Sequence, residues 1–379
     1  MMLDPFFQWC ANTFKKIVGW IVGLIMLILS PFVAIYTFIK GAGLILKILV
    51  LALLLPLFFA YGQFFWHTLW IRGFDTQYPN NLNLTGNLVP AGEQVSPEGG
   101  GDDTKTCGRS RIVDVTAHLL DFNINQNKWI SSMPQYKFGV FKVVDWDQTW
   151  VFDNKAAFQR GVHQTLARTA VELTDTLGRV RGTSQINPDL KIAKGNIQFD
   201  QYTWFLNPFG SQPFGPTTPT PTYYRAALKS LETYNENLAN CKATFDARAD
   251  NLLQFLDRIA KDIGSTSASI KERAEQYNSG WFDTRADDIF MYAKGQLYGY
   301  YGILKAARAD FATVINNREV DDIWDNMEDH LLKAIELDPW IISNGKEDGM
   351  VMPTHLTTIG FYILRARSNL VEIRSVLDR

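Results

Sequence analysis

The sequence predicts a mainly α-helical protein, with an N-terminal transmembrane region followed by a large soluble helical bundle and short extended segments. Two observations predict this class. Residues 48–71 are predominantly apolar and carry no formal charge. The later part of the chain repeats apolar residues at intervals of three and four over several long stretches, which is the period of helices that bury one face.

The apolar stretch at residues 44–71 is the predicted membrane anchor. A helix of this length, at about 1.5 Å per residue, crosses the roughly 30 Å hydrocarbon core of a bilayer. Lys47 lies near one end, and Trp66 and Trp70 lie near the other, where amphipathic rings favour the membrane interface. A buried core helix is the alternative, which is disfavoured because long soluble helices normally carry a polar stripe.

A second apolar stretch, residues 17–39, follows an interfacial segment of aromatic residues and lysines at 1–16. Ser30 and Pro31 interrupt it, and an interior proline removes a helical hydrogen bond. We therefore weigh a re-entrant or in-plane hairpin against a second full span. The hairpin is preferred because it leaves every lysine before residue 72 on one side of the membrane and the soluble part on the other. A second span would place the soluble part in the cytoplasm.

Composition divides the soluble part into four segments. Residues 73–108 are rich in Asn, Pro, Gly and Asp and predict a stalk or linker. Residues 109–206 predict a first helical lobe, and residues 223–379 predict a helical-bundle lobe. Between the lobes, residues 207–222 are rich in proline and predict a connection or a long loop.

Apolar periodicity predicts the helices of the first lobe. Residues 111–121 form a short amphipathic pattern. Asp153 or Asn154 is predicted to cap a longer helix that ends at Gly178. Residues 127–150 contain a partial alternation of apolar and polar residues, which predicts an extended piece.

The bundle lobe is predicted to contain three long antiparallel helices. The first carries a heptad-like apolar stripe that ends at Gly264. The second opens at Thr284 and Asp287, and the third covers residues 356–377. We interpret these stripes as core-facing, and an oligomer seam is the alternative.

Four stretches of the soluble part resemble a family of bacterial inner-membrane proteins known only as a domain of unknown function. They are DNKAAFQRGVHQTLARTAVELTDTLGRVRGTSQINPDL at 153–190, YRAALKSLETYNENLANCKATFDARADNLLQFLDRIAKDIGS at 224–265, ADDIFMYAKGQLYGYYGILKAARADF at 286–311 and NGKEDGMVMPTHLTTIGFYILRARSNL at 344–370. The resemblance covers most of residues 110–379. It implies one N-terminal membrane anchor and a soluble domain that faces the periplasm, and it implies no activity. The stretch at 17–39 departs from that pattern.

Interaction sites are predicted at two places. Arg179 and Arg181 follow a helix end, where their guanidinium groups could hold a phosphate or carboxylate or could tie two segments together. The other place is the loop before the last helix, because loops carried by rigid helices often bind ligands. Its candidate residues are Asn344, Gly345, Asp348, Pro353 and His355.

Two cysteines, Cys107 and Cys241, lie in the soluble part. They could form one disulfide in an oxidising compartment. Two unrelated thiols are the alternative, since Cys241 falls on an apolar helical stripe where a buried thiol is common.

The sequence predicts no catalytic, cofactor or metal site. Its five histidines lack metal-ligand spacing. The acidic residues from Asp321 to Asp329 are interpreted as a solvated helix face rather than a cation site. An all-helical hydrolase would need a buried glutamate with a raised pKa in an aromatic groove, and Glu172, Glu232 and Glu336 are the candidates.

Composition favours lipid and protein partners. The chain has 37 Lys and Arg against 39 Asp and Glu, well mixed, which argues against a nucleic-acid partner. The leading hypothesis is a membrane-anchored, non-enzymatic scaffold or accessory subunit of a bacterial envelope assembly, located in the inner membrane with a periplasmic soluble domain. The alternatives are a periplasmic hydrolase of cell wall or lipid, and a self-assembling membrane organiser that forms homo-oligomers.

Overall fold

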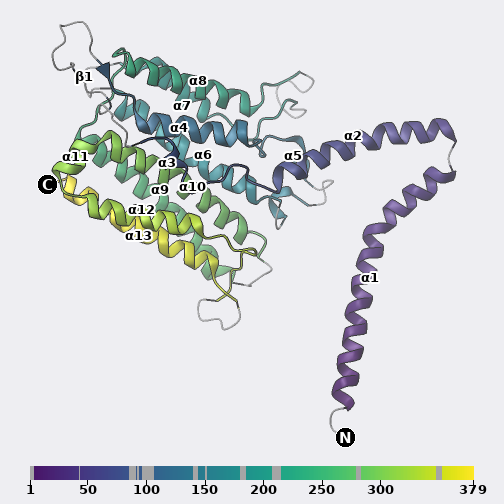
Figure 1. Ribbon diagram of the computed structural model, residues 1–379. Helices are drawn as coiled ribbons and strands as arrows, with labels where there is room; N and C mark the ends of the chain where they lie inside the picture. The colour runs from purple at the N-terminus through teal and green to yellow at the C-terminus, as the bar shows by residue number, and fades with distance from the viewer. Residues whose placement is uncertain are drawn as a thin grey trace. The chain divides into compact units, whose positions relative to one another are not determined.

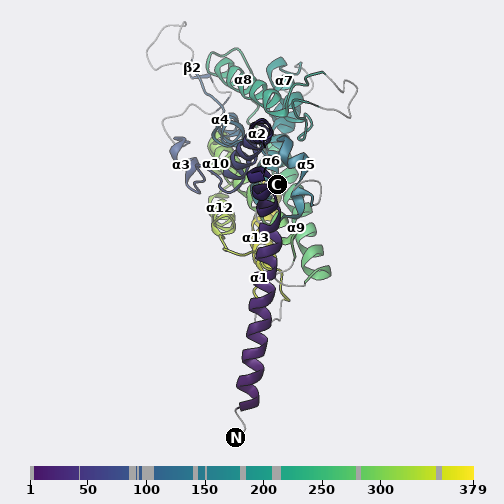
Figure 2. The same cartoon turned by 90° about the vertical axis from the view of Figure 1, so that its right-hand side faces the viewer.

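Two helical units make up the chain, Met1–Phe64 and Phe65–Arg379. The computed structural model describes residues 4–41, 43–84, 91, 94–95, 106–139, 144–149, 152–179, 185–206, 215–278, 283–346 and 352–379. Figures 1 and 2 show that the second unit is built of packed helices, with short strands at its edge. The predicted mainly α-helical class is confirmed.

The first unit contains α1 (Asp4–Gly41) and most of α2 (Leu44–Thr68). Among the described residues, α2 is the one helix long and apolar enough to cross a membrane, with a mean hydropathy of 2.6 over its most apolar window. It is consistent with the predicted anchor. The predicted hairpin within 17–39 is wrong, because α1 passes through Ser30 as one continuous helix. An interior proline costs one hydrogen bond, which a long helix can absorb as a bend.

The described part of the predicted stalk belongs to the second unit. Within it, α3 (Tyr78–Asn81) is short, and β1 (Gln94–Val95) pairs antiparallel with β2 (Thr106–Cys107). The hydroxyl of buried Tyr78 donates to the carbonyl of Tyr298 at 3.0 Å. The described part of the predicted stalk or linker therefore packs on the second unit at Tyr78. Scattered aromatic side chains in a polar segment supply such core contacts without leaving a periodicity.

Most of the predicted helices are present. The helix predicted at 111–121 coincides with α4, and the last predicted helix coincides with α13. Within 127–150, where an extended piece was predicted, the described residues include α5 and one short 3-10 turn at Trp146–Gln148. Residues 140–143 and 150 lie outside the described residues, so the prediction stays untested there. The α-helices that follow α3 are α4 (Arg111–Asp121), α5 (Pro134–Phe138), α6 (Asn154–Glu172), α7 (Pro188–Ile197), α8 (Thr220–Ala239), α9 (Ala249–Gln276), α10 (Ala286–Asp310), α11 (Ala312–Asn317), α12 (Asp321–Glu336) and α13 (His355–Leu377). Single π-helical turns, η1 (Phe122–Gln126) and η3 (Leu173–Leu177), extend α4 and α6.

The first helix predicted for the bundle is two helices. The chain leaves the helical conformation after α8 and resumes it at α9, and Gly264 lies inside α9 rather than at a break. The guanidinium group of Arg367 on α13 lies against Gly264, so this glycine provides room for a neighbouring side chain. The apolar stripe continued across the gap with nearly the same spacing, which concealed the turn.

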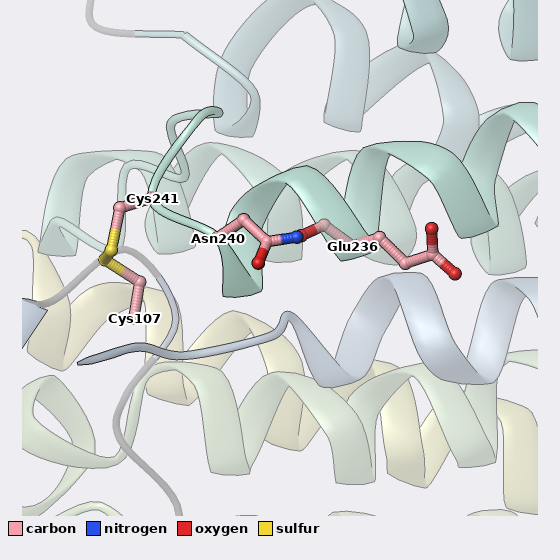
Figure 3. Close-up of a disulfide and its surroundings, with 4 residues drawn as sticks. All are labelled: Cys107, Glu236, Asn240 and Cys241. Carbon is pink, nitrogen blue, oxygen red and sulfur yellow. A yellow bond between two sulfur atoms is a disulfide. The ribbon is translucent and has the colours of Figure 1, made fainter. Parts of the chain in front are cut away.

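A disulfide joins Cys107 on β2 to Cys241, which follows the end of α8 (Figure 3). The two Cα atoms are 5.4 Å apart, and the cysteines are separated by 134 residues in the sequence. The side-chain amide of Asn240 donates to the carbonyl of Glu236 at 2.9 Å. Cys241 itself has a positive φ of 56°, which turns the chain out of the helix.

The two predicted lobes share one hydrophobic core. Helix α10 is central to it, because it packs on α6, α4, α9 and α12. It runs parallel to α6: Gly295 meets Phe158, and Gly299 meets Thr165 further along both helices. Periodicity predicts which face of each helix is buried, whereas it does not predict which helix covers that face.

We expect Gly295→Ala to destabilise the protein. A methyl group at this position would collide with the backbone carbonyl of Phe158, so α6 and α10 would have to separate. Overpacking of this kind typically costs about 1–3 kcal/mol. Chemical denaturation of the full-length protein measures the loss. Gly195→Ala on α7 is the matched control, because nothing lies within 4 Å of its added methyl group; an equal effect of both variants would contradict the close contact.

Candidate functional site

Three aspartates gather at the adjoining N-terminal ends of α6 and α10. Asp153 precedes the first turn of α6, while Asp287 and Asp288 lie in the first turn of α10. Because the two helices are parallel and in contact, these ends lie at the same end of the unit. The three residues are 0%, 2% and 8% exposed, respectively.

These buried carboxyl groups have few partners. Among the residues that the structure describes, both side-chain oxygens of Asp153 and Asp287, and Oδ1 of Asp288, have no hydrogen-bond partner. The predicted helix start at Asp153 is right, but its side chain does not cap α6. A buried polar group without a partner costs free energy that folding must offset elsewhere. Such groups are therefore candidates for function rather than for stability.

Burial makes the three carboxyl groups weak acids. Burial, and to a smaller extent the nearby carboxyl groups of Asp288 and Asp287, raises the pKa of Asp153 to about 9. Burial and the charge of Asp288 raise the pKa of Asp287 to about 8. Burial also raises the pKa of Asp288 to about 7, against the attraction of Arg160. The cluster consequently retains protons at neutral pH, and ionisation of one carboxyl group disfavours ionisation of its neighbours.

Two adjoining clefts give solvent access to this region. The larger, about 560 Å³, is lined by Asp288, Arg160, Arg285 and Tyr292 among others. The smaller, about 390 Å³, is lined by aromatic and polar side chains that include Trp146, Tyr136 and Tyr202. Asp147 and Arg285 line both clefts. Asp288 is thus the member of the acidic cluster that a ligand could reach.

Ion pairs organise the walls of the larger cleft. The guanidinium group of Arg160 lies 3.7 Å from Asp147 and donates to the hydroxyl of Tyr202 at 3.2 Å. Tyr136 also donates to Asp147. In another part of the lining, Nε of Arg273 donates to Oδ2 of Asp283 at 2.9 Å. Arginine and carboxylate groups therefore both line the cleft, which suits a polar ligand that carries charge of both signs.

The predicted loop before α13 supports this wall. The side-chain amide of Asn344 donates to Oδ2 of Asp283 and to the carbonyls of Arg273 and Tyr277 at the end of α9, each at 3.1 Å. Gly345 lies against Met352. Asn344 therefore positions a cleft residue through an ion pair, in addition to its role in the loop.

Two other predicted loop residues contact Ser343. The carbonyl of Pro353 accepts from its hydroxyl at 2.7 Å, and Nδ1 of His355 accepts from its backbone N–H at 3.0 Å. Asp348 and Arg181 lie outside the described residues. Arg179 is on the surface, where its Nε donates to the carbonyl of Asp175 at 3.0 Å. The structure therefore brings Asn344 to the cleft region and leaves Arg179 bound to its own helix end.

The glutamates considered for hydrolysis lie elsewhere. Burial raises the pKa of Glu172, which accepts from the hydroxyl of Thr176 at 3.2 Å and lies 3.7 Å from Arg258. Glu232 and Glu336 are exposed. None of the three lines either cleft.

The acidic stretch on α12 is held by basic side chains. Arg308 on α10 contacts Asp321 at 2.7 Å and also pairs with Asp325, while Lys333 pairs with Asp329 at 2.6 Å. In the part of the chain that the structure describes, no group of three or more His, Cys, Asp or Glu side chains is arranged to hold a metal ion.

Sequence reasoning missed the acidic cluster. Asp153 and Asp287 were interpreted as ordinary helix starts, where acidic residues are common because the helix dipole favours them. Nothing in the local sequence indicates that both starts are buried against each other. The sequence does show acidic residues at the starts of two helices that contain glycines. This pattern indicates an acidic cluster only when the two helices are known to be parallel and in contact.

Comparison with protein families gives one finding. Residues 137–279 and 268–379 match the family described as "Uncharacterized protein conserved in bacteria (DUF2333)". The matched region contains the acidic cluster, the ion pairs of Arg160 with Asp147 and of Arg273 with Asp283, and the loop before α13. The match agrees with the resemblance seen in the sequence. Comparison with curated proteins and with solved structures found no match.

Proposed function

Because this chain belongs to the DUF2333 family of uncharacterised proteins conserved in bacteria, we propose its function from its own architecture: a membrane-anchored scaffold or accessory subunit of a bacterial envelope assembly. In this proposal α2 crosses the inner membrane and the second unit lies in the periplasm. The role is non-enzymatic, and the partners are other envelope proteins.

The disulfide is the observation that carries the periplasmic location. Cys107 and Cys241 are bonded, and such bonds persist in oxidising compartments such as the periplasm. The charge pattern agrees with this side. If α1 stays on the cytoplasmic face, all four lysines before residue 72 lie there and α2 is the only crossing, as the positive-inside rule favours.

Reporter fusions test the location. A reporter that is active only in the periplasm, placed after Arg379 and separately near Gly100, should be active at both points. The same positions should be silent with a reporter that is active only in the cytoplasm. The reverse pattern would make α1 and α2 two crossings and would remove the proposed location.

One face of α13 supports a scaffold role. Phe361, Leu364 and Val371 are exposed, and their spacing of three and seven places them on one side of the helix. An apolar helix of another envelope protein would pack on such a row. A photo-crosslinking residue at Leu364 in living cells should yield an adduct with a different envelope protein, whereas one at exposed Glu232 on α8 should not. An adduct only with itself would favour the membrane organiser instead.

An envelope hydrolase acting on wall or lipid is the second candidate, and Asp288 favours it. This residue lines a cleft, and its pKa of about 7 suits a general acid or base. The adjoining cleft offers the exposed ring of Tyr202 for contact with a sugar or acyl group. Turnover of cell-wall or phospholipid substrate that is lost in Asp288→Asn and kept in Asp322→Asn would establish it. Absence of turnover by the wild type would remove it.

A further inference from the structure

Exposed aromatic side chains collect at the end of the second unit where the chain enters from α2. We call Trp66, Trp70, Tyr202, Tyr277 and Trp340 the aromatic end face. Trp340 is 98% exposed, and the other four are between 42% and 55% exposed. Soluble surfaces seldom present several large aromatic rings together without a partner.

The two entering tryptophans are fixed at the N-terminal end of α6. The ammonium group of Lys155, in the first turn of α6, donates to the carbonyl of Trp70 at 2.8 Å. The rings of Trp66 and Trp70 meet edge to face at 5.3 Å, and the guanidinium group of Arg72 lies 5.6 Å from the Trp66 ring.

Tyr202 and Tyr277 are held at the same end by arginines. The hydroxyl of Tyr202 accepts from Arg160, in the second turn of α6. Tyr277 directly follows α9, where the guanidinium group of Arg273 lies 3.9 Å from its ring centre. Arg273 in turn pairs with Asp283, just before α10 begins.

Trp340 lies between two residues that contact the first part of α10 or the residues just before it. Two residues before Trp340, Asp338 accepts from Lys294, in the third turn of α10, at 3.1 Å. Four residues after Trp340, Asn344 donates to Asp283 at 3.1 Å. The segment that carries Trp340 is therefore confined to the same end as the other four rings.

No spacer separates this end from α2. Helix α2 ends at Thr68, and the backbone of Arg72 already exchanges two hydrogen bonds of 3.0 Å with the side chain of Asn127. The residues between them span at most about 10–14 Å when fully extended. A bilayer that α2 crosses must consequently lie close to this end of the unit.

We propose that the aromatic end face rests on the interfacial layer of the bilayer that α2 crosses, with lipid headgroups as its partner. Tryptophan and tyrosine favour this layer because their rings are apolar and their N–H and O–H groups remain hydrated. The inference rests on the proposed anchoring by α2. It adds that the soluble unit has a fixed lipid-facing end, so that the clefts beside Asp288 open near the membrane surface.

Site-directed fluorescence on the full-length protein tests this contact. In a Cys10→Ser background, the variants Trp340→Cys, Val371→Cys and Leu53→Cys each carry one free thiol, because Cys107 and Cys241 remain bonded. Each thiol is labelled with an environment-sensitive fluorophore, and the protein is reconstituted in phosphatidylcholine vesicles. Val371 is the matched exposed control, about 24 Å from the start of α13.

We expect the probe at position 340 to shift to the blue in vesicles and to lose fluorescence when lipids with spin-labelled headgroups are added. The probe at 371 should show neither effect, and the probe at 53 should be quenched by lipids labelled in their acyl chains. Quenching at 53 with equal behaviour at 340 and 371 would overturn the end-face contact and leave the anchor intact. A blue shift at 340 without quenching would indicate a protein contact and would also overturn it. An unquenched probe at 53 would overturn the anchor and the contact together.

Discussion

Removing the disulfide by Cys241→Ser is expected to lower the free energy of unfolding by about 3–5 kcal/mol, because a bond that closes a loop of more than a hundred residues restricts the unfolded chain strongly. A loss of this size should lower the midpoint of thermal unfolding by about 5–10 °C in a unit of this length. Cys107→Ser should have the same effect, and the double variant should add nothing further.

Thermal unfolding of the full-length protein in lipid nanodiscs, followed by circular dichroism, measures this loss. The wild type in the presence of a reducing agent should match the Cys241→Ser variant. Cys10→Ser is the matched control, since Cys10 lies in α1 and belongs to the other unit. Identical unfolding of the oxidised and reduced wild type would contradict the role given to the bond.

Replacing Asp153 by asparagine is expected to stabilise the protein at alkaline pH. The folded-state pKa of Asp153 is raised to about 9, above the ordinary value of 3.8, by burial and by Asp288 and Asp287. A raised pKa means that the folded state binds a proton that the unfolded state has already released. The contribution of Asp153 to the free energy of unfolding is therefore fully present below about pH 4 and is lost progressively as the pH rises toward 9.

The size of this effect follows from proton binding: the wild-type carboxyl releases a proton on unfolding, whereas the asparagine side chain has no such proton to release. One such proton corresponds to about 1.4 kcal/mol per pH unit. Because the three carboxyl groups are electrostatically coupled, we expect about half of that slope, so that Asp153→Asn is more stable than the wild type by roughly 3 kcal/mol at pH 8. The difference should become small near pH 4, where the folded-state carboxyl is protonated and the unfolded-state carboxyl, with its ordinary pKa of 3.8, is partly protonated.

Chemical denaturation at several pH values between 4 and 9 tests this prediction. Asp322→Asn is the matched control, because this aspartate of α12 is exposed and should leave the pH dependence unchanged. Parallel stability curves for Asp153→Asn and the wild type would show that the three buried carboxyl groups do not govern the pH dependence.

Local sequence was sufficient where one segment determines its own structure. The uncharged run at 44–71 identified α2, and the three-and-four spacing identified α4, α6 and α13 with accurate ends. It failed where the deciding contact comes from elsewhere in the chain. Gly264 looks like a helix break, yet Arg367 from α13 fills the space beside it.

The sequence by itself determined the class of this protein: a long apolar helix, consistent with a membrane anchor, followed by a helical unit of the DUF2333 family. Hydrophobic length and period are properties of short segments, so they can be seen without a structure. Only the tertiary structure decided that α6 and α10 run parallel. That arrangement brings Asp153, Asp287 and Asp288 together away from water, and burial in shared surroundings is what turns three ordinary helix-start residues into weak acids.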